Sequence, residues 1–79
     1  MAVKIAFNLD TKTENREQIT IRSPYADLGR TRDNISDRLD ETAQSHKALM
    51  PVRDADTGNY VFVNTMKLSD IRVFEVEKE

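Results

Sequence analysis

The start of the chain alternates hydrophobic and polar positions. Every second residue from Val3 to Leu9 is large and apolar, and the residues between them are polar or small. A period of two predicts a strand with one buried face. A shorter alternation over 18–22 places two isoleucines on one side. Because the segment 10–17 is polar throughout, we expect these two strands to form a hairpin with a loose, charged connection.

The middle of the chain predicts one helix with two possible starts. Proline cannot donate a hydrogen bond to a strand and favours the first turn of a helix, so Ser23-Pro24 ends the second strand. Two starts are possible. The helix begins either at Pro24 or, if Gly29 breaks the segment, near Asp33, and it runs to about Lys47. We favour the later start. The predicted apolar face is thin, has Leu39 as its anchor and consists of Leu28, Ile35, Leu39 and Ala43.

A second hairpin is expected after the helix. The run 49–52 either ends the helix or forms a short strand, and Pro51 within it favours an edge position. The polar segment 53–59 then turns the chain, with Gly58 as the residue best suited to a positive φ. We therefore expect residues 50–52 to pair with residues 60–63.

The last two strands carry apolar side chains on both of their faces, in contrast to the first strand. Val61 and Val63 share one face, and a polar break at Ser69-Asp70 precedes the final strand. One thin helix covers only one face of a sheet, so other apolar side chains stay exposed unless a bulge near Val73 turns them inward. The side chains concerned are Tyr60, Phe62, Phe74 and Val76. We predict a partner-binding surface made by Tyr60, Phe62 and Phe74.

These elements together predict an α+β fold in one domain over residues 1–79. We expect a mainly antiparallel sheet of four to five strands with one helix on one face, in the order β-β-α-β-β. In a domain of this size a single core supplies only a few kcal/mol, roughly 3–5, so uncovered apolar surface matters. We therefore expect a homodimer or higher oligomer. The element order and the pattern Gly-x-x-Val-x-Val-Asn-x-x-x-Leu-x-x-Ile over 58–71 resemble several small bacterial domain families of unknown function, and they assign no functional residue.

Composition narrows the function classes. The chain has 12 basic and 14 acidic residues, which gives no general attraction to nucleic acids or anionic membranes. It has no cysteine for a disulfide or a thiolate nucleophile, and His46 is its single histidine. We expect no catalytic residue, no metal and no cofactor, and hence no enzyme. No apolar run has the length of a signal peptide or a membrane span, so we expect a cytoplasmic protein.

One basic and aromatic cluster supports an alternative function. Tyr25, Arg30 and Arg32 lie close together in the sequence, near the later helix start. Backbone amides near Asp33 and the guanidinium groups would hold a phosphate, and Tyr25 would stack on a base. Neighbouring aspartates would neutralise the arginines in a salt-bridged loop. The leading expectation is a non-enzymatic binding protein. The alternative is a small nucleotide- or nucleic-acid-binding regulator that uses Tyr25, Arg30 and Arg32.

Overall fold

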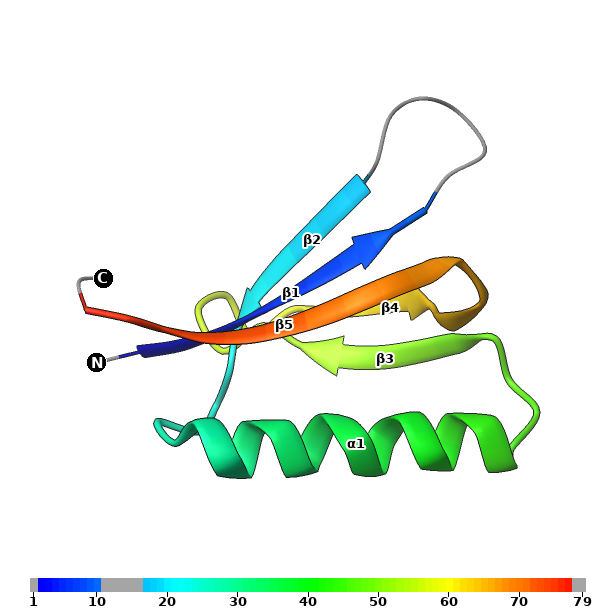
Figure 1. Cartoon of the computed structure of the whole chain (residues 1–79), viewed down its shortest axis with the longest axis horizontal. Coiled ribbons are helices and arrows are strands. Elements are labelled where there is room, and N and C mark those ends of the chain that lie inside the picture. Colours follow the sequence, from blue (N-terminus) through cyan, green and yellow to red (C-terminus); the bar gives the residue numbers. More distant parts are fainter. Residues whose placement is uncertain (1, 11–16, 78–79) are drawn as a thin grey trace.

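The structure, a computed structural model, describes residues 2–10 and 17–77. The described strands form two antiparallel sheets, a three-stranded one in the order β2-β1-β5 and a two-stranded one made by β3 and β4 (Figure 1). The α+β class and the order of the predicted elements are confirmed, but the single sheet of four to five strands is wrong. The elements are β1 (Ala2–Leu9), β2 (Glu17–Arg22), α1 (Leu28–Gln44), β3 (Leu49–Arg53), β4 (Tyr60–Asn64), the 3-10 helix η1 (Thr65–Lys67) and β5 (Leu68–Val76).

β1 is the central strand of the three-stranded sheet, and the large apolar residues of its alternating pattern are buried, as expected. Ile5 lies opposite Ile21 of β2 and Val73 of β5, so the inner face of this sheet is apolar across all three strands. The register shifts between Asn8 and Leu9, where β5 has one extra residue, and it is continuous at Val73. The alternative of a bulge near Val73 is therefore wrong. The charged connection expected after β1 lies mostly outside the described residues.

The two-stranded sheet is the predicted second hairpin. Met50 pairs with Val63 and Val52 with Val61, which confirms both the strand at 49–52 and its partner. Gly58 has φ 76° in the connecting turn, where its amide donates to the carbonyl of Asp54 at 2.7 Å. Glycine is the residue that adopts this left-handed conformation without a steric penalty.

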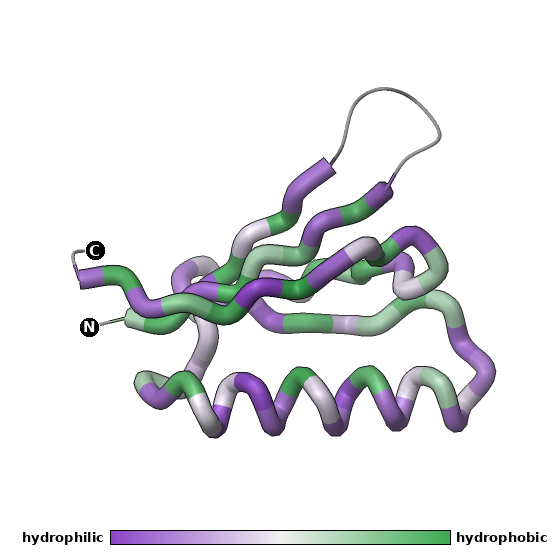
Figure 2. The backbone as a smooth tube through the Cα atoms, viewed as in Figure 1, coloured by the Kyte–Doolittle hydropathy of each residue, from purple (hydrophilic) through white to green (hydrophobic). Residues whose placement is uncertain are grey.

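Both sheets and α1 enclose one hydrophobic core. In Figure 1, α1 runs along one side of the molecule, next to β3, and Figure 2 shows apolar positions recurring along it between hydrophilic ones. The sheets are also joined at their margins, because the amide of Ala55 donates to the carbonyl of Arg22 at 3.0 Å. The buried core residues are Ile5, Phe7, Leu9, Ile21, Ile35, Met50, Val52 and Val63.

The helix starts and ends at residues other than those expected from the sequence. α1 begins at Leu28, between the two expected starts, because the extended residue Asp27 caps it by accepting from the Gly29 amide at 3.0 Å. The apolar stripe is also placed differently. Ile35 is buried and Leu39 only partly buried, so Ile35 is the anchor. Ala43, expected on the buried face, is exposed.

A chain of buried hydroxyl groups fixes the connection between β2 and α1. The amide of Tyr25 donates to Ser23 Oγ at 3.1 Å, and Ser23 Oγ lies 2.7 Å from Thr31 Oγ1. Thr31 Oγ1 donates to the carbonyl of Asp27 at 3.0 Å. Because Thr31 uses its hydroxyl hydrogen on Asp27, it accepts from Ser23. Both side chains are buried, so the hydroxyl hydrogen of Ser23 depends on Thr31 for its acceptor.

The helix ends at Gln44, before the expected position near Lys47, in a left-handed cap. The amide of Lys47 donates to the carbonyl of Thr42, and the amide of His46 donates to the carbonyl of Ala43, both at 3.2 Å. His46 has φ 57° at the position where this type of cap favours glycine. His46 is thus a capping residue on the surface of the protein.

Replacing His46 by glycine is expected to raise stability by up to about 1 kcal/mol, because a left-handed conformation costs an L-residue about 1–2 kcal/mol, which exceeds the entropic cost of glycine. Thermal unfolding followed by circular dichroism measures the change. Ser45→Gly is the matched control, since Ser45 has φ −82° and gains no such relief. A lower melting temperature for His46→Gly would contradict this account of the cap.

Candidate binding surface

The outer face of the β3–β4 hairpin carries the largest group of exposed apolar side chains that share one sheet face among the described residues. Phe62 lies directly opposite Pro51, so the two side chains lie on the same face of the hairpin. Tyr60 is 65% exposed, Phe62 62% and Leu49 52%, whereas Val63 on the inner face is fully buried. We call the surface made by Leu49, Pro51, Tyr60 and Phe62 the hairpin face.

The hairpin face is large for an exposed apolar patch on a chain of this size. Aromatic side chains bury about 150–250 Å² each when fully covered, so Tyr60 and Phe62 at these exposures leave roughly 200–300 Å² in water. Leu49 and Pro51 extend the patch. Apolar patches of about 300–600 Å² on monomeric proteins often mark interaction sites.

Phe74 does not belong to the hairpin face. It lies on β5 opposite Lys4, on the outer face of the three-stranded sheet, and is 40% exposed. The two sheets turn their inner faces toward the shared core, so their outer faces point in different directions. The structure therefore brings Tyr60 and Phe62 together and separates Phe74 from them.

The outer face of the three-stranded sheet is polar at the end that carries Asn8. Asn8 in the central strand donates from Nδ2 to Asp70 Oδ1 and accepts from Gln18 Nε2 at 2.8 Å. A surface hollow of about 270 Å³ lies against these side chains, and Ser69 and Arg72 complete its lining. Sequence reasoning missed this cluster, because it is assembled from three strands that are distant in sequence. Its side chains bond mainly to one another across the sheet.

The three residues of the alternative ligand site are only partly brought together. Arg30 lies over the ring of Tyr25, with its guanidinium carbon 5.6 Å from the ring centroid. Arg32 is two helical positions further on, roughly 200° around α1, and pairs with Asp33 at 3.2 Å. Because α1 begins at Leu28, the amides near Asp33 lie inside the helix and are not those of its N-terminus.

The charges around Tyr25 also do not favour an anion. The hollow beside Tyr25 and Arg30, about 270 Å³, is lined in addition by Asp33 and Asp37. Two carboxylates beside one guanidinium give a net negative lining, which repels phosphate. This geometry gives no support to the nucleotide-binding alternative.

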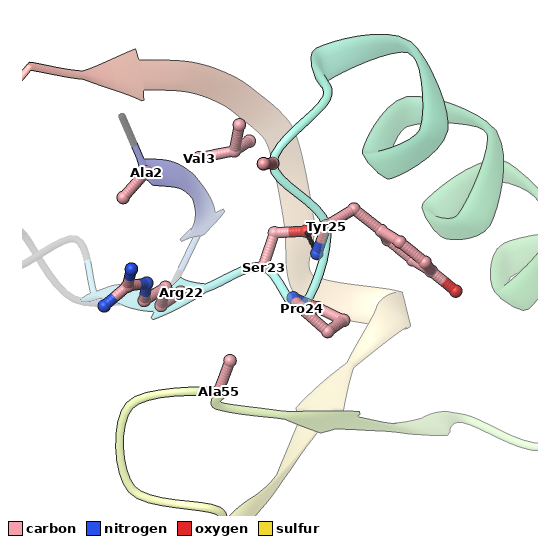
Figure 3. Close-up of a pocket in the computed structure, with 8 residues that line it drawn as sticks. Ala2, Val3, Arg22, Ser23, Pro24, Tyr25 and Ala55 are labelled. Atoms are coloured by element: carbon pink, nitrogen blue, oxygen red, sulfur yellow. Dashed lines mark hydrogen bonds between the residues drawn. The ribbon is translucent and has the colours of Figure 1, made fainter.

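A third hollow, of about 260 Å³, lies where β2 leads into α1 (Figure 3). Arg22 at its margin forms an ion pair with Asp56 of the β3–β4 turn at 3.0 Å. Figure 3 shows the Tyr25 ring projecting away from the other labelled side chains, so it does not fill the hollow. The remaining lining residues have small side chains. It is lined by Ala2, Val3, Arg22, Ser23, Pro24, Tyr25, Ala26 and Ala55.

Comparisons of the chain with protein family models, with curated proteins and with solved structures gave no significant match. Across residues 2–10 and 17–77, no helix combines the length and the apolar character needed to cross a membrane. The same residues contain no cluster of three or more histidine or carboxylate side chains able to hold a metal ion.

Proposed function

We propose that the protein is a non-enzymatic binding protein that acts as a homo-oligomer, in which copies meet through the β3–β4 hairpin. The observation that carries this proposal is the exposure of Tyr60 and Phe62 side by side on one face, each more than 60% in contact with water. Tyrosine and phenylalanine are enriched in protein interfaces, where their burial contributes much of the binding free energy.

The chemistry of the hairpin face supports binding and not catalysis. Leu49, Pro51 and Phe62 have no polar side-chain atoms, and the phenol of Tyr60 is exposed to solvent. General acid–base catalysis needs titratable groups held together in a cleft, where burial and neighbours shift their pKa values. The hairpin face is mainly apolar, and the exposed Arg53 of β3 lies at its end, opposite Tyr60.

Phe62→Asp is the substitution that tests the proposal. It places a charge in the middle of the hairpin face, and in a two-fold contact the charge enters the interface twice. We expect the variant to be a folded monomer at concentrations where the wild-type chain is a dimer or larger. Light scattering coupled to size-exclusion chromatography gives the molar mass, and circular dichroism verifies the fold.

Phe74→Asp is the matched control, because it makes the same change at an exposed phenylalanine on the other sheet. This variant is expected to keep the oligomeric state of the wild type. If Phe74→Asp disrupted assembly and Phe62→Asp left it intact, the contact would lie on the three-stranded sheet and the proposal would fail.

A further inference from the structure

Strand β4 has one edge that no other described strand covers, since the sheet that contains it has only β3 as its second member. Two backbone hydrogen bonds fix the direction of its peptide groups. The amide of Asp54 donates to the carbonyl of Asn59 at 2.9 Å, and the amide of Thr65 donates to the carbonyl of Ala48 at 2.8 Å. Residues 59, 61, 63 and 65 therefore point toward β3. Peptide groups alternate along a strand, so those of Tyr60, Phe62 and Asn64 point to the open edge.

The other strand of the hairpin has its own edge protected. Pro51 lies opposite Phe62, at a position whose peptide groups point away from β4, and proline has no amide hydrogen to leave unpaired there. Its carbonyl oxygen accepts from Arg38 Nη1 of α1 at 3.2 Å. A proline and a covering helix are two of the ways in which proteins prevent an edge strand from pairing with another chain.

The remaining edge strands are protected by charge, and β4 is not. β2 contains Glu17 and Arg22, and its end is covered where Ala55 donates to the Arg22 carbonyl. β5 contains Asp70, Arg72 and Glu75. β4 has the sequence Tyr-Val-Phe-Val-Asn, with no charged residue, no proline and no glycine. Among the described strands, β4 alone combines an open edge with an uncharged sequence of high β-propensity.

We propose that β4 pairs with β4 of a second copy in an antiparallel register centred on Phe62. This proposal rests on the proposed function and specifies its contact. Phe62 of one copy lies opposite Phe62 of the other, and Tyr60 lies opposite Asn64. In this register all outward peptide groups of Tyr60, Phe62 and Asn64 exchange hydrogen bonds with the second copy, because residues with outward peptide groups face each other.

The sequence of β4 suits a second copy of this chain as the occupant. Val61 and Val63 flank Phe62 symmetrically, so an antiparallel pair places valine opposite valine on the inner face. The two Phe62 rings then lie next to each other on the outer face, where cross-strand aromatic pairs stabilise a sheet. The result is one four-stranded sheet in which both edges are β3, the strand protected by Pro51 and Arg38.

Amide hydrogen exchange, measured by nuclear magnetic resonance, tests the register. The wild-type chain is compared with the Phe62→Asp variant at a concentration where light scattering shows the wild type to be an oligomer. Protection factors for the amides of Tyr60, Phe62 and Asn64 are expected to be roughly tenfold or more higher in the wild type. The outward amides of β5 are the internal control. They include those of Ile71 and Val73. The Ser23 amide donates to the Val3 carbonyl, so the odd-numbered residues of β1 point toward β2, and the odd-numbered residues of β5 opposite them point outward.

The outcomes separate this inference from the proposed function. Protection confined to the three β4 amides, with Ile71 and Val73 unchanged, supports edge pairing of two copies. A wild-type oligomer whose β4 amides exchange as fast as those of the variant overturns the register and leaves the proposed function standing, because the copies then meet face to face. A wild-type chain that is monomeric at every concentration overturns both.

Discussion

The Phe7→Ala variant is expected to be largely unfolded at room temperature. Phe7 is fully buried where the two sheets share their core. Truncating a buried phenylalanine to alanine costs about 3–5 kcal/mol, through lost apolar burial and the cavity that remains. A single core in a domain of this size rarely supplies more than about 3–5 kcal/mol. Circular dichroism and urea titration give the fraction folded and the free energy of unfolding.

The same change at Phe74 is the control for the loss of an aromatic ring from a strand. Phe74 is 40% exposed on the outer face of the three-stranded sheet, so Phe74→Ala is expected to cost about 1 kcal/mol or less. If Phe7→Ala unfolded cooperatively at nearly the same urea concentration as the wild type, Phe7 would not be an essential part of the shared core.

Thr31→Val is expected to lower stability by roughly 1–3 kcal/mol, although valine has almost the same shape as threonine. The substitution leaves the buried Ser23 hydroxyl without its acceptor 2.7 Å away. A buried polar group that loses its partner costs about 1–3 kcal/mol. Urea unfolding of the purified variant measures the effect. Thr31→Val and Ser23→Ala together form a double-mutant cycle. Ser23→Ala is expected to cost less in the Thr31→Val variant than in the wild type, because there it removes a hydroxyl group that has already lost its acceptor.

Thr42→Val is the matched control, because Thr42 also lies in α1 and also donates to the carbonyl four residues earlier, that of Arg38 at 2.8 Å. Thr42 is only half-buried, so water replaces its lost bond, and a change within about 0.5 kcal/mol is expected. Equal losses for the two threonine variants would assign the effect to helix propensity and contradict the role of the Ser23–Thr31 bond.

The sequence predicts the strands of this protein better than it predicts their assembly. The period of two in β1 and the glycine turn before β4 are local signals, and both are confirmed in place. The division into two sheets is not a local property. It depends on β5 returning to β1, and on the break between β4 and β5. That break lies at η1, where Asn64 accepts from the Met66 amide at 3.0 Å, and the expected break at Ser69-Asp70 is wrong, because both residues lie inside β5.

The helix start was missed because Gly29 was expected to break the segment, whereas it lies in the first turn of α1, and because Asp27 was not considered as the cap. Ser23 and Asp27 are both residues that cap helices, and the sequence alone does not rank them. Ser23 accepts from the Tyr25 amide and bonds to Thr31, so its hydroxyl is engaged in a turn, and Asp27 caps α1. The Ser23–Thr31 bond joins side chains that the turn between β2 and α1 brings together, so neighbouring residues alone do not predict it.

The sequence predicts the exposure of the three aromatic residues but not how they are grouped. The alternating pattern correctly indicates that Tyr60, Phe62 and Phe74 lie on faces opposite to the core residues of their strands. It does not show that β5 belongs to the other sheet, which separates Phe74 from the hairpin face. The open edge of β4 is likewise visible only when the pairing of every described strand is known.

The most direct test of self-association is the molar mass of the wild-type chain in solution, measured by light scattering over a concentration series. We expect a mass that rises from that of one chain toward twice that value as concentration increases, since β4 pairing about Phe62 closes on itself in a dimer. A mass equal to one chain at every concentration, millimolar included, would contradict it.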